Sequence, residues 1–158
     1  MNLHSNDRIV LATIGGLYLA AIGYGVANGL VALPVLLGAV LLALAVGCAL
    51  AGQGRTVSQI GLPALGMAMV ALVIHVARGH NETHFAVFAF LACALVYRHW
   101  LPVVSGAATI AVHHVTFNFM QEWAWGPMCF TQPGLGKVIE HAVYVVAESA
   151  MLILLAQR

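Results

Sequence analysis

The sequence predicts an all-α integral membrane protein, a bundle of six transmembrane helices, on three observations. Of its 158 residues, 62% are hydrophobic and 7% are charged, whereas a soluble domain carries about 25% charged residues. No charged residue occurs between positions 9 and 52, although one membrane span needs only about 20 apolar residues. Polar turns divide the remainder into segments of similar length. We therefore expect a single transmembrane domain over residues 1–158.

The long uncharged run contains the first two predicted helices, near 8–27 and 30–52. The break between them falls at Asn28-Gly29, because these residue types favour turns. Pro34 then lies in the first turn of the second helix, where its missing N–H costs little. The first apolar run is too long for the core of a cleavable signal peptide, so we expect it to remain as a membrane helix.

Four further helices are predicted near 58–78, 82–98, 102–123 and 136–157. The turn between the third and fourth is marked by Arg78-Gly79, and the loop before the last helix is rich in glycine and proline. Arg98 and Trp100 occupy the short turn before Pro102. They have the basic and aromatic character of side chains that anchor a helix at the membrane interface.

Six spans place both termini on the same side of the membrane. The termini and loops of that side contain four arginines, Arg8, Arg55, Arg98 and Arg158. The positive-inside rule therefore predicts that both termini are cytoplasmic. The net charge of +1 gives no indication of a nucleic-acid partner. We expect the helices to contact the lipid bilayer. The sequence leaves open whether the protein forms a homodimer.

Seven histidine and glutamate side chains fall in the half of the predicted bundle opposite the termini: His75, Glu82, His84, His113, His114, His141 and Glu148. Ionisable groups inside a membrane are costly and usually face the interior of the bundle. Because several helix ends carry these side chains to one depth, we predict that they form a cluster. Neutral imidazole is the commonest metal ligand, and carboxylates complete or orient such sites. The cluster is therefore predicted to bind a transition metal.

Spacing suggests different roles within this cluster. His141 and Glu148 are seven residues apart, about 10.5 Å along one helix face. His113 points about 100° away from His114, so we expect one of them to bind the metal and the other to donate a hydrogen bond. The predicted ligands are His75, His84, His141 and one of that pair, completed by Glu82 or Glu148.

The candidate ligands outnumber the four of a tetrahedral zinc site, which leaves two metal ions, or one ion with surrounding hydrogen-bonding groups. Nitrogen-rich sites suit transition metals better than magnesium or calcium, and we expect copper or iron ahead of zinc. Haem b between two histidines of facing helices is the alternative cofactor. A purely structural polar network and a proton or ion path are the other interpretations. We expect Cys129 to be a free loop cysteine rather than a soft ligand.

These residues resemble the histidine-rich, multi-helix membrane sensor region found at the N-terminus of some bacterial chemoreceptors and diguanylate cyclases. The similarity rests on five pieces, His75-x-x-x-Gly79-x-x-Glu82-x-His84-Phe85, Tyr97-Arg98-His99-Trp100, His113-His114-x-x-Phe117, Gln121 and His141-Ala-x-Tyr144-Val-Val-x-Glu148. The resemblance implies a sensory input domain in the bacterial inner membrane. It also implies a cytoplasmic output domain of the chemoreceptor or diguanylate cyclase type, which is not among these residues.

A membrane sensor is the predicted function, because a metal bound in the outer half of the bundle would shift the last helix, which leads to the cytoplasmic side. A haem-based redox or gas sensor and a small membrane di-metal oxidase are the alternatives. The oxidase is disfavoured because no large soluble part forms a substrate site, and no catalytic residue is assigned. A transporter is disfavoured because the inner half of the predicted bundle is almost purely apolar.

Overall fold

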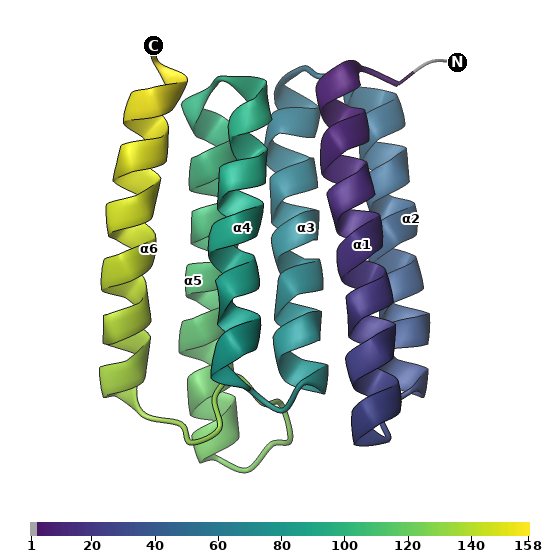
Figure 1. Cartoon of the computed structure of the whole chain (residues 1–158). Helices are drawn as coiled ribbons and strands as arrows, with labels where there is room; N and C mark the ends of the chain where they lie inside the picture. The colour runs from purple at the N-terminus through teal and green to yellow at the C-terminus, as the bar shows by residue number, and fades with distance from the viewer. Residues whose placement is uncertain (1–2) are drawn as a thin grey trace.

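The computed structural model describes residues 3–158, and over that range the chain is all-helical with no strand. The helices run up and down side by side, so that both ends of the chain lie at the same end of the bundle (Figure 1). The elements are α1 (Ser5–Asn28), α2 (Ala32–Gly52), α3 (Thr56–Val76), the 3-10 helix η1 (Asn81–His84), α4 (Phe85–Ala94), the 3-10 helix η2 (Leu95–Tyr97), α5 (Trp100–Glu122) and α6 (Leu135–Ala156).

Five of these helices, α1, α2, α3, α5 and α6, are long and apolar enough to cross a membrane. The predicted all-α fold is therefore confirmed, with five helices of spanning length where the sequence predicts six. The fourth segment, Asn81–Tyr97, is a shorter apolar helix. Both of its ends are wound as 3-10 turns, η1 and η2.

Backbone turns set the helix boundaries close to the predicted limits. α1 ends where Gly29 adopts a left-handed φ of 72°, at the predicted break. α3 ends at Val76, two residues before the predicted limit, because Arg78 and Gly79 both adopt left-handed φ angles, 57° and 70°. α1 begins at Ser5, three residues earlier than predicted. The first turn of α1 therefore includes residues that the sequence analysis assigned to the terminus.

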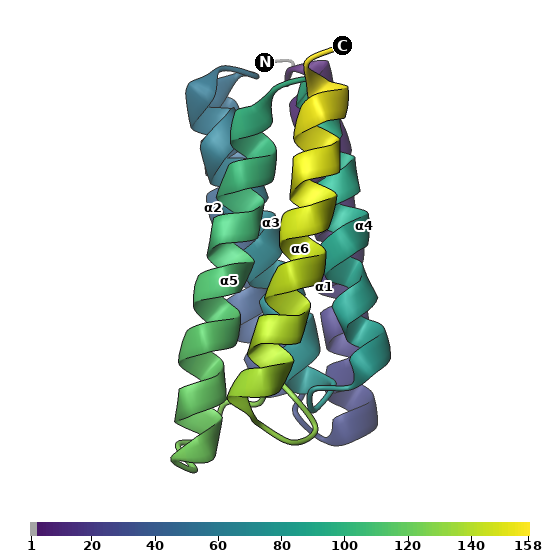
Figure 2. The same ribbon diagram turned by 90° about the vertical axis from the view of Figure 1, so that its left-hand side faces the viewer.

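α3 is the central helix of the bundle. It packs against α1, α2, α4 and α5, and it contains eleven buried residues where α6 contains three. Gly66 of α3 allows the Phe90 ring of α4 to lie against the helix backbone, because a Cβ at this position would overlap the ring. α6 packs against α5, α4 and η2, at the edge of the bundle (Figures 1 and 2). α6 is therefore the least enclosed helix.

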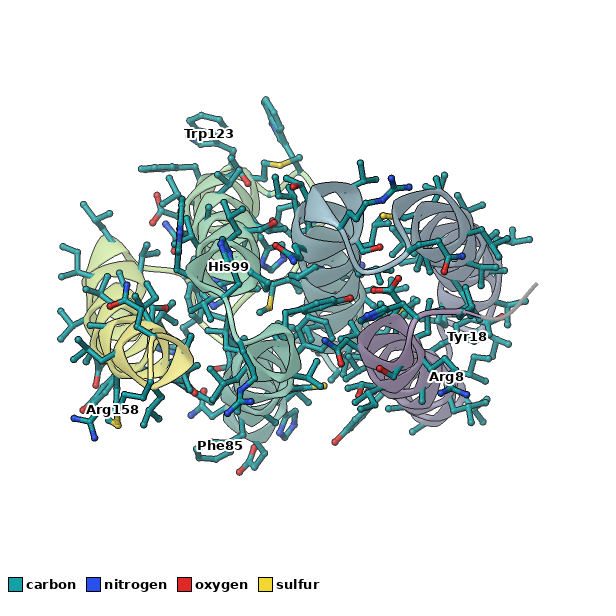
Figure 3. The ribbon with its side chains drawn as sticks, turned by 90° about the horizontal axis from the view of Figure 1, so that it is seen from above. Arg8, Tyr18, Phe85, His99, Trp123 and Arg158 are labelled. Carbon is teal, nitrogen blue, oxygen red and sulfur yellow. The ribbon has the colours of Figure 1, made fainter. Side chains whose placement is uncertain are left out.

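The outward surface of the bundle is apolar. Five large side chains of α6 are each at least 60% exposed, namely Val143, Tyr144, Val146, Met151 and Leu154. Seen along the bundle axis, Phe85 and Trp123 point away from the helices on opposite sides (Figure 3). Contiguous exposed apolar surface of this kind is unfavourable in water, so it is suited to contact with lipid.

One carboxylate near the termini is completely buried, a feature that the sequence analysis did not predict. Asp7, in the first turn of α1, has no exposed area. Its Oδ2 accepts hydrogen bonds from the Ser58 hydroxyl (2.9 Å) and the Gly54 N–H (2.8 Å). Its Oδ1 accepts one from the Tyr97 hydroxyl (2.7 Å). Asp7 thereby ties α1 to the start of α3 and to η2, and both of its oxygens are paired.

Candidate metal centre

Three histidines from three helical segments meet near the end of the bundle opposite the termini. His84 is the last residue of η1, His114 belongs to α5 and His141 belongs to α6. The ring centroids are 5.3 Å apart for His84 and His114, 5.0 Å for His84 and His141, and 5.6 Å for His114 and His141. One nitrogen of each ring lies within 4.8 Å of those of the other two. We call this group the three-histidine cluster.

The alternating direction of the helices brings these positions together. α5 runs toward this end of the bundle, whereas η1–α4 and α6 start from it (Figure 2). His114 lies about two turns before the end of α5, and His141 about two turns after the start of α6. His84 and His114 are buried, with 3% and 6% of their area exposed, and His141 is partly buried. The cluster thus lies inside the bundle rather than on its end surface.

Each ring of the cluster is held by its own helical segment. The Nδ1 atoms of His84, His114 and His141 lie 3.1, 3.0 and 2.8 Å from the carbonyl oxygens four residues earlier, those of His80, Ile110 and Lys137. A carbonyl oxygen only accepts hydrogen bonds, so in each neutral ring the network assigns the proton to Nδ1. Nε2 is then an unprotonated acceptor. The Nε2 atom of His84 is buried and has no hydrogen-bond partner.

The loop between α5 and α6 covers one side of the cluster. Phe130 stacks on the His84 ring, with the planes 2° apart and the centroids 5.5 Å apart. Gln121 holds this part of the loop, because its Oε1 accepts two successive backbone N–H groups and its Nε2 donates to the Phe130 carbonyl (2.6 Å). His75 holds it as well, since its Nδ1 accepts the Met128 N–H (2.9 Å). In this arrangement His75 positions the loop.

Cys129 lies beside a fourth histidine, His113, with 4.0 Å between Sγ and Nδ1. The thiol is completely buried, and burial raises its pKa to about 12, so it is neutral at pH 7. The Nε2 of His113 is buried without a partner. His113, His114 and Cys129 form a second group that could hold an ion. The two groups share His114, whose single free lone pair can serve one ion, so the geometry provides one complete site with His113 and Cys129 next to it.

The two predicted carboxylates lie away from the cluster. Glu82 is at the surface with 77% of its side chain exposed, and its Oε2 is 3.4 Å from Nδ1 of His80. Glu148 is seven residues from His141 on α6, about 10.5 Å along the helix, and its Oε2 is buried without a partner. The structure thus brings together His84, His114 and His141, places His113 beside them, and leaves His75, Glu82 and Glu148 outside the three-histidine cluster.

Asn118 has a role that the sequence analysis did not assign. It is fully buried on α5. Its Oδ1 accepts the N–H of Gly134, directly before α6 (2.7 Å), and its Nδ2 donates to Oε1 of Glu122 (2.9 Å). The bond to Gly134 fixes the start of α6 against α5 and so helps to position His141, whereas the bond to Glu122 lies within α5. In the sequence, the signal for this role is an asparagine flanked by Phe117 and Phe119.

No protein-family model matches the sequence, and the comparisons with curated proteins and with solved structures gave no match. The fold and the cluster define the class of the protein. Over residues 3–158 it is all-helical, with five helices long and apolar enough to cross a membrane, and it contains buried histidine groups that could hold a metal ion.

Proposed function

We propose that the protein is a membrane-embedded sensory input domain that binds one transition metal ion through His84, His114 and His141 and signals through α6 to a cytoplasmic output. One observation supports the metal site above all others. A backbone carbonyl lies at hydrogen-bond distance from the Nδ1 of each ring, which leaves each Nε2 free as an acceptor, and one nitrogen of each ring lies within 4.8 Å of those of the other two.

A structural hydrogen-bond network does not account for this arrangement. Acceptors cannot hydrogen-bond to one another, and a buried polar group without a partner costs roughly 1–3 kcal/mol. The carboxylate of Asp7, by contrast, has a donor for each oxygen. A metal cation would supply a partner for the free nitrogens of these neighbouring neutral imidazoles.

The donor set favours a particular group of ions. Imidazole nitrogens suit copper, iron and zinc, whereas magnesium and calcium prefer oxygen ligands. We propose copper or iron, and among divalent ions the general order of affinities places copper highest. Three protein ligands leave at least one coordination position open for a further ligand.

The geometry favours a bare ion over haem. Two axial histidines of a haem lie on opposite faces of a flat macrocycle, whereas the third ring of this cluster lies within 5.6 Å of both others. That third ring would occupy the space of the macrocycle. A pair of metal ions is less favoured because the two candidate groups share His114.

We further propose that the chain crosses the bacterial inner membrane six times and that both termini lie in the cytoplasm. The fourth segment, with its 3-10 ends, reaches roughly 29 Å, close to the ~30 Å of a hydrocarbon core. Four arginines lie at the end of the bundle that carries the termini, as the positive-inside rule expects for the cytoplasmic side: Arg8, Arg55, Arg98 and Arg158.

A membrane-impermeant maleimide applied to intact cells tests this orientation. Thr131→Cys introduces an exposed thiol in the loop between α5 and α6, and we expect it to be labelled from outside. Cys129 lies two residues away but is buried, with a pKa raised to about 12, so the parent protein should stay unlabelled at this loop. Labelling of the variant only after lysis would overturn the topology.

α6 is the proposed transmitter because it is restrained least and carries one of the three ligands. Binding of one ion by three imidazoles draws the start of α6 toward α4 and α5. The helix continues to the end of the bundle that holds the termini (Figure 1). A shift at His141 is therefore carried along a rigid element to the side of the proposed output.

Elemental analysis of the protein purified into nanodiscs tests the metal site. We expect about one ion per chain in the parent, and loss of that ion in His84→Ala and His114→Ala. His80→Ala is the matched control, since its imidazole is 69% exposed and its backbone carbonyl remains. One ion per chain in both cluster variants, with helical content preserved, would refute the proposal.

A further inference from the structure

An apolar groove leads away from the three-histidine cluster between α5 and α6. Its volume is about 470 Å³. Its walls are formed by residues 104–115 of α5 and 138–153 of α6, with Val87 and Phe88 of α4 beside the cluster. These helix stretches are roughly 17 to 22 Å long. The groove is thus an elongated site that the three histidines close at one end.

Small side chains create the groove. Alanines occupy both walls, among them Ala107, Ala108 and Ala111 on α5 and Ala142 and Ala150 on α6. Small residues on facing membrane helices normally allow the backbones to approach, but here they leave space. Ala108, Ala111 and Ala142 are exposed, so the groove opens sideways toward the surroundings of the bundle. A molecule dissolved in the bilayer could enter there.

The polar atoms of the groove indicate which chemical groups a ligand must carry. His84, which is 3% exposed, has an unpaired Nε2 at the closed end, and Ser149, which is 8% exposed, has an unpaired hydroxyl roughly 12 Å farther along α6. None of the described lining residues is an aspartate, glutamate, lysine or arginine. A suitable ligand is therefore uncharged and elongated, with a hydrogen-bonding group at one end.

The closed end of the groove is built from four planar rings. Phe88 lies one turn after His84 on α4, and both line the groove together with His114 and His141. An aromatic head group would pack among these rings in edge-to-face or offset contacts. A phenolic hydroxyl on that head group would donate a hydrogen bond to a free Nε2.

We propose that the groove binds a membrane quinol, which combines a dihydroxylated aromatic ring with a single isoprenoid chain. One ring hydroxyl lies at the three-histidine cluster, and the chain extends along α5 and α6. The inference rests on the proposed function, because the head group meets the same three imidazoles that hold the ion, at its open position. The occupancy of the groove then follows the amount of quinol in the membrane.

Binding of tritiated decylubiquinol to the protein in nanodiscs, with the signal of empty nanodiscs subtracted, tests this proposal. The protein is loaded with zinc under anaerobic conditions, because zinc has no redox chemistry that would oxidise the quinol. The combination of Ala108→Leu and Ala142→Leu fills the groove, and Ala150→Leu fills it farther from the cluster. Val143→Leu, at a position 61% exposed on the outer side of α6, is the matched control.

We expect quinol affinity to fall at least tenfold in both groove-filled proteins and to stay unchanged in the control, with zinc content equal throughout. Equal affinity in the parent and the groove-filled proteins would overturn the proposal. Dodecan-1-ol has a comparable chain but no ring, so displacement of the quinol by an equal concentration of this alcohol would overturn the quinol assignment.

A protein that does not bind metal is distinguished from one that does not bind quinol. If the parent retains no zinc, the same quinol measurements are made on the metal-free protein, in which a hydroxyl can donate directly to Nε2. The tenfold difference between the parent and the groove-filled proteins is expected there too, and its absence would refute quinol binding whatever the metal content.

Discussion

Both ends of the bundle bury polar side chains, but the two ends differ in whether the protein supplies these side chains with hydrogen-bond partners. Near the termini, each oxygen of Asp7 accepts at least one hydrogen bond from the protein. At the other end, the Nε2 atoms of His84 and His113 are buried without a partner. Most buried polar groups in proteins are paired, and an unpaired one requires an explanation. The first end therefore has a structural role, and the second end is the one for which we propose a binding role.

This contrast is not visible in the sequence. Asp7 and His114 both lie in long helices that are apolar enough to span a membrane, where an ionisable side chain suggests function. The two residues differ in the number of hydrogen-bond partners that the folded protein supplies. A carboxylate with three donors is a cross-link between helices, whereas a ring with a free nitrogen beside two other histidines is a candidate metal ligand.

Removal of the carboxylate near the termini should have the largest effect on stability. Asp7→Ala leaves the Ser58 hydroxyl, the Tyr97 hydroxyl and the Gly54 N–H without their acceptor. We expect the free energy of unfolding to fall by roughly 3 kcal/mol or more, measured by circular dichroism during denaturation in detergent. Asn6→Ala is the neighbouring control. A loss below about 1 kcal/mol would mean that water replaces the carboxylate and that this end is not structural.

Removal of a ring nitrogen at the other end should act on binding instead of folding. His114→Phe keeps a planar ring but lacks both ring nitrogens. The metal-free protein loses the bond between Nδ1 and the Ile110 carbonyl, so its stability should fall by no more than about 1.5 kcal/mol. A metal concentration of 100 times Kd stabilises the parent by ~2.7 kcal/mol, and the variant should show no such gain. The measurement is thermal unfolding with and without metal, and equal stabilisation of both proteins would contradict the ligand assignment.

Release of the loop that covers the cluster should have an intermediate effect. His75→Ala removes the acceptor of the Met128 N–H, and the loop then holds Phe130 less firmly against His84. We expect metal affinity to fall about 10- to 100-fold, as for other residues that orient ligands, with one ion still bound at saturation. A titration that never reaches one ion per chain would instead make His75 a ligand.

Removal of the exposed carboxylate should have the smallest effect. Glu82 is 77% exposed and contacts His80, outside the three-histidine cluster. Glu82→Ala is expected to change metal affinity by less than about twofold, because a surface ion pair contributes little. A tenfold loss in the same titration would show that Glu82 turns inward when metal binds.

The all-α fold was predictable, and so was the approach of three of the candidate histidines to one another. Long apolar runs separated by turns define the helices, and the alternation of helix direction brings His84, His114 and His141 to one depth. The roles of His75 and Glu82 depend on the turns after α3, where two left-handed residues and a 3-10 helix direct each side chain. Spacing along the sequence does not determine such turns.

Asp7 was missed for a different reason. It lies within the first turn of α1, at a position where the sequence resembles a polar terminus, and its partners are 47, 51 and 90 residues away along the chain. Partners at such separations follow from packing around α3. The groove between α5 and α6 was also beyond prediction, because alanine-rich helix faces are equally compatible with tight contact.

Because the three-histidine cluster contains no carboxylate, an ion bound there keeps its whole charge. His141 lies six residues inside α6, roughly 9 Å from its start and about a third of the way through a ~30 Å hydrocarbon core. Moving one elementary charge across the full membrane corresponds to ~2.3 kcal/mol per 100 mV. In the proposed orientation, the free energy of metal binding from outside would therefore change by about 0.7 kcal/mol per charge per 100 mV, in favour of binding when the cell interior is negative. With the proposed metal site and orientation, the occupancy of the cluster would depend on membrane voltage as well as on metal concentration.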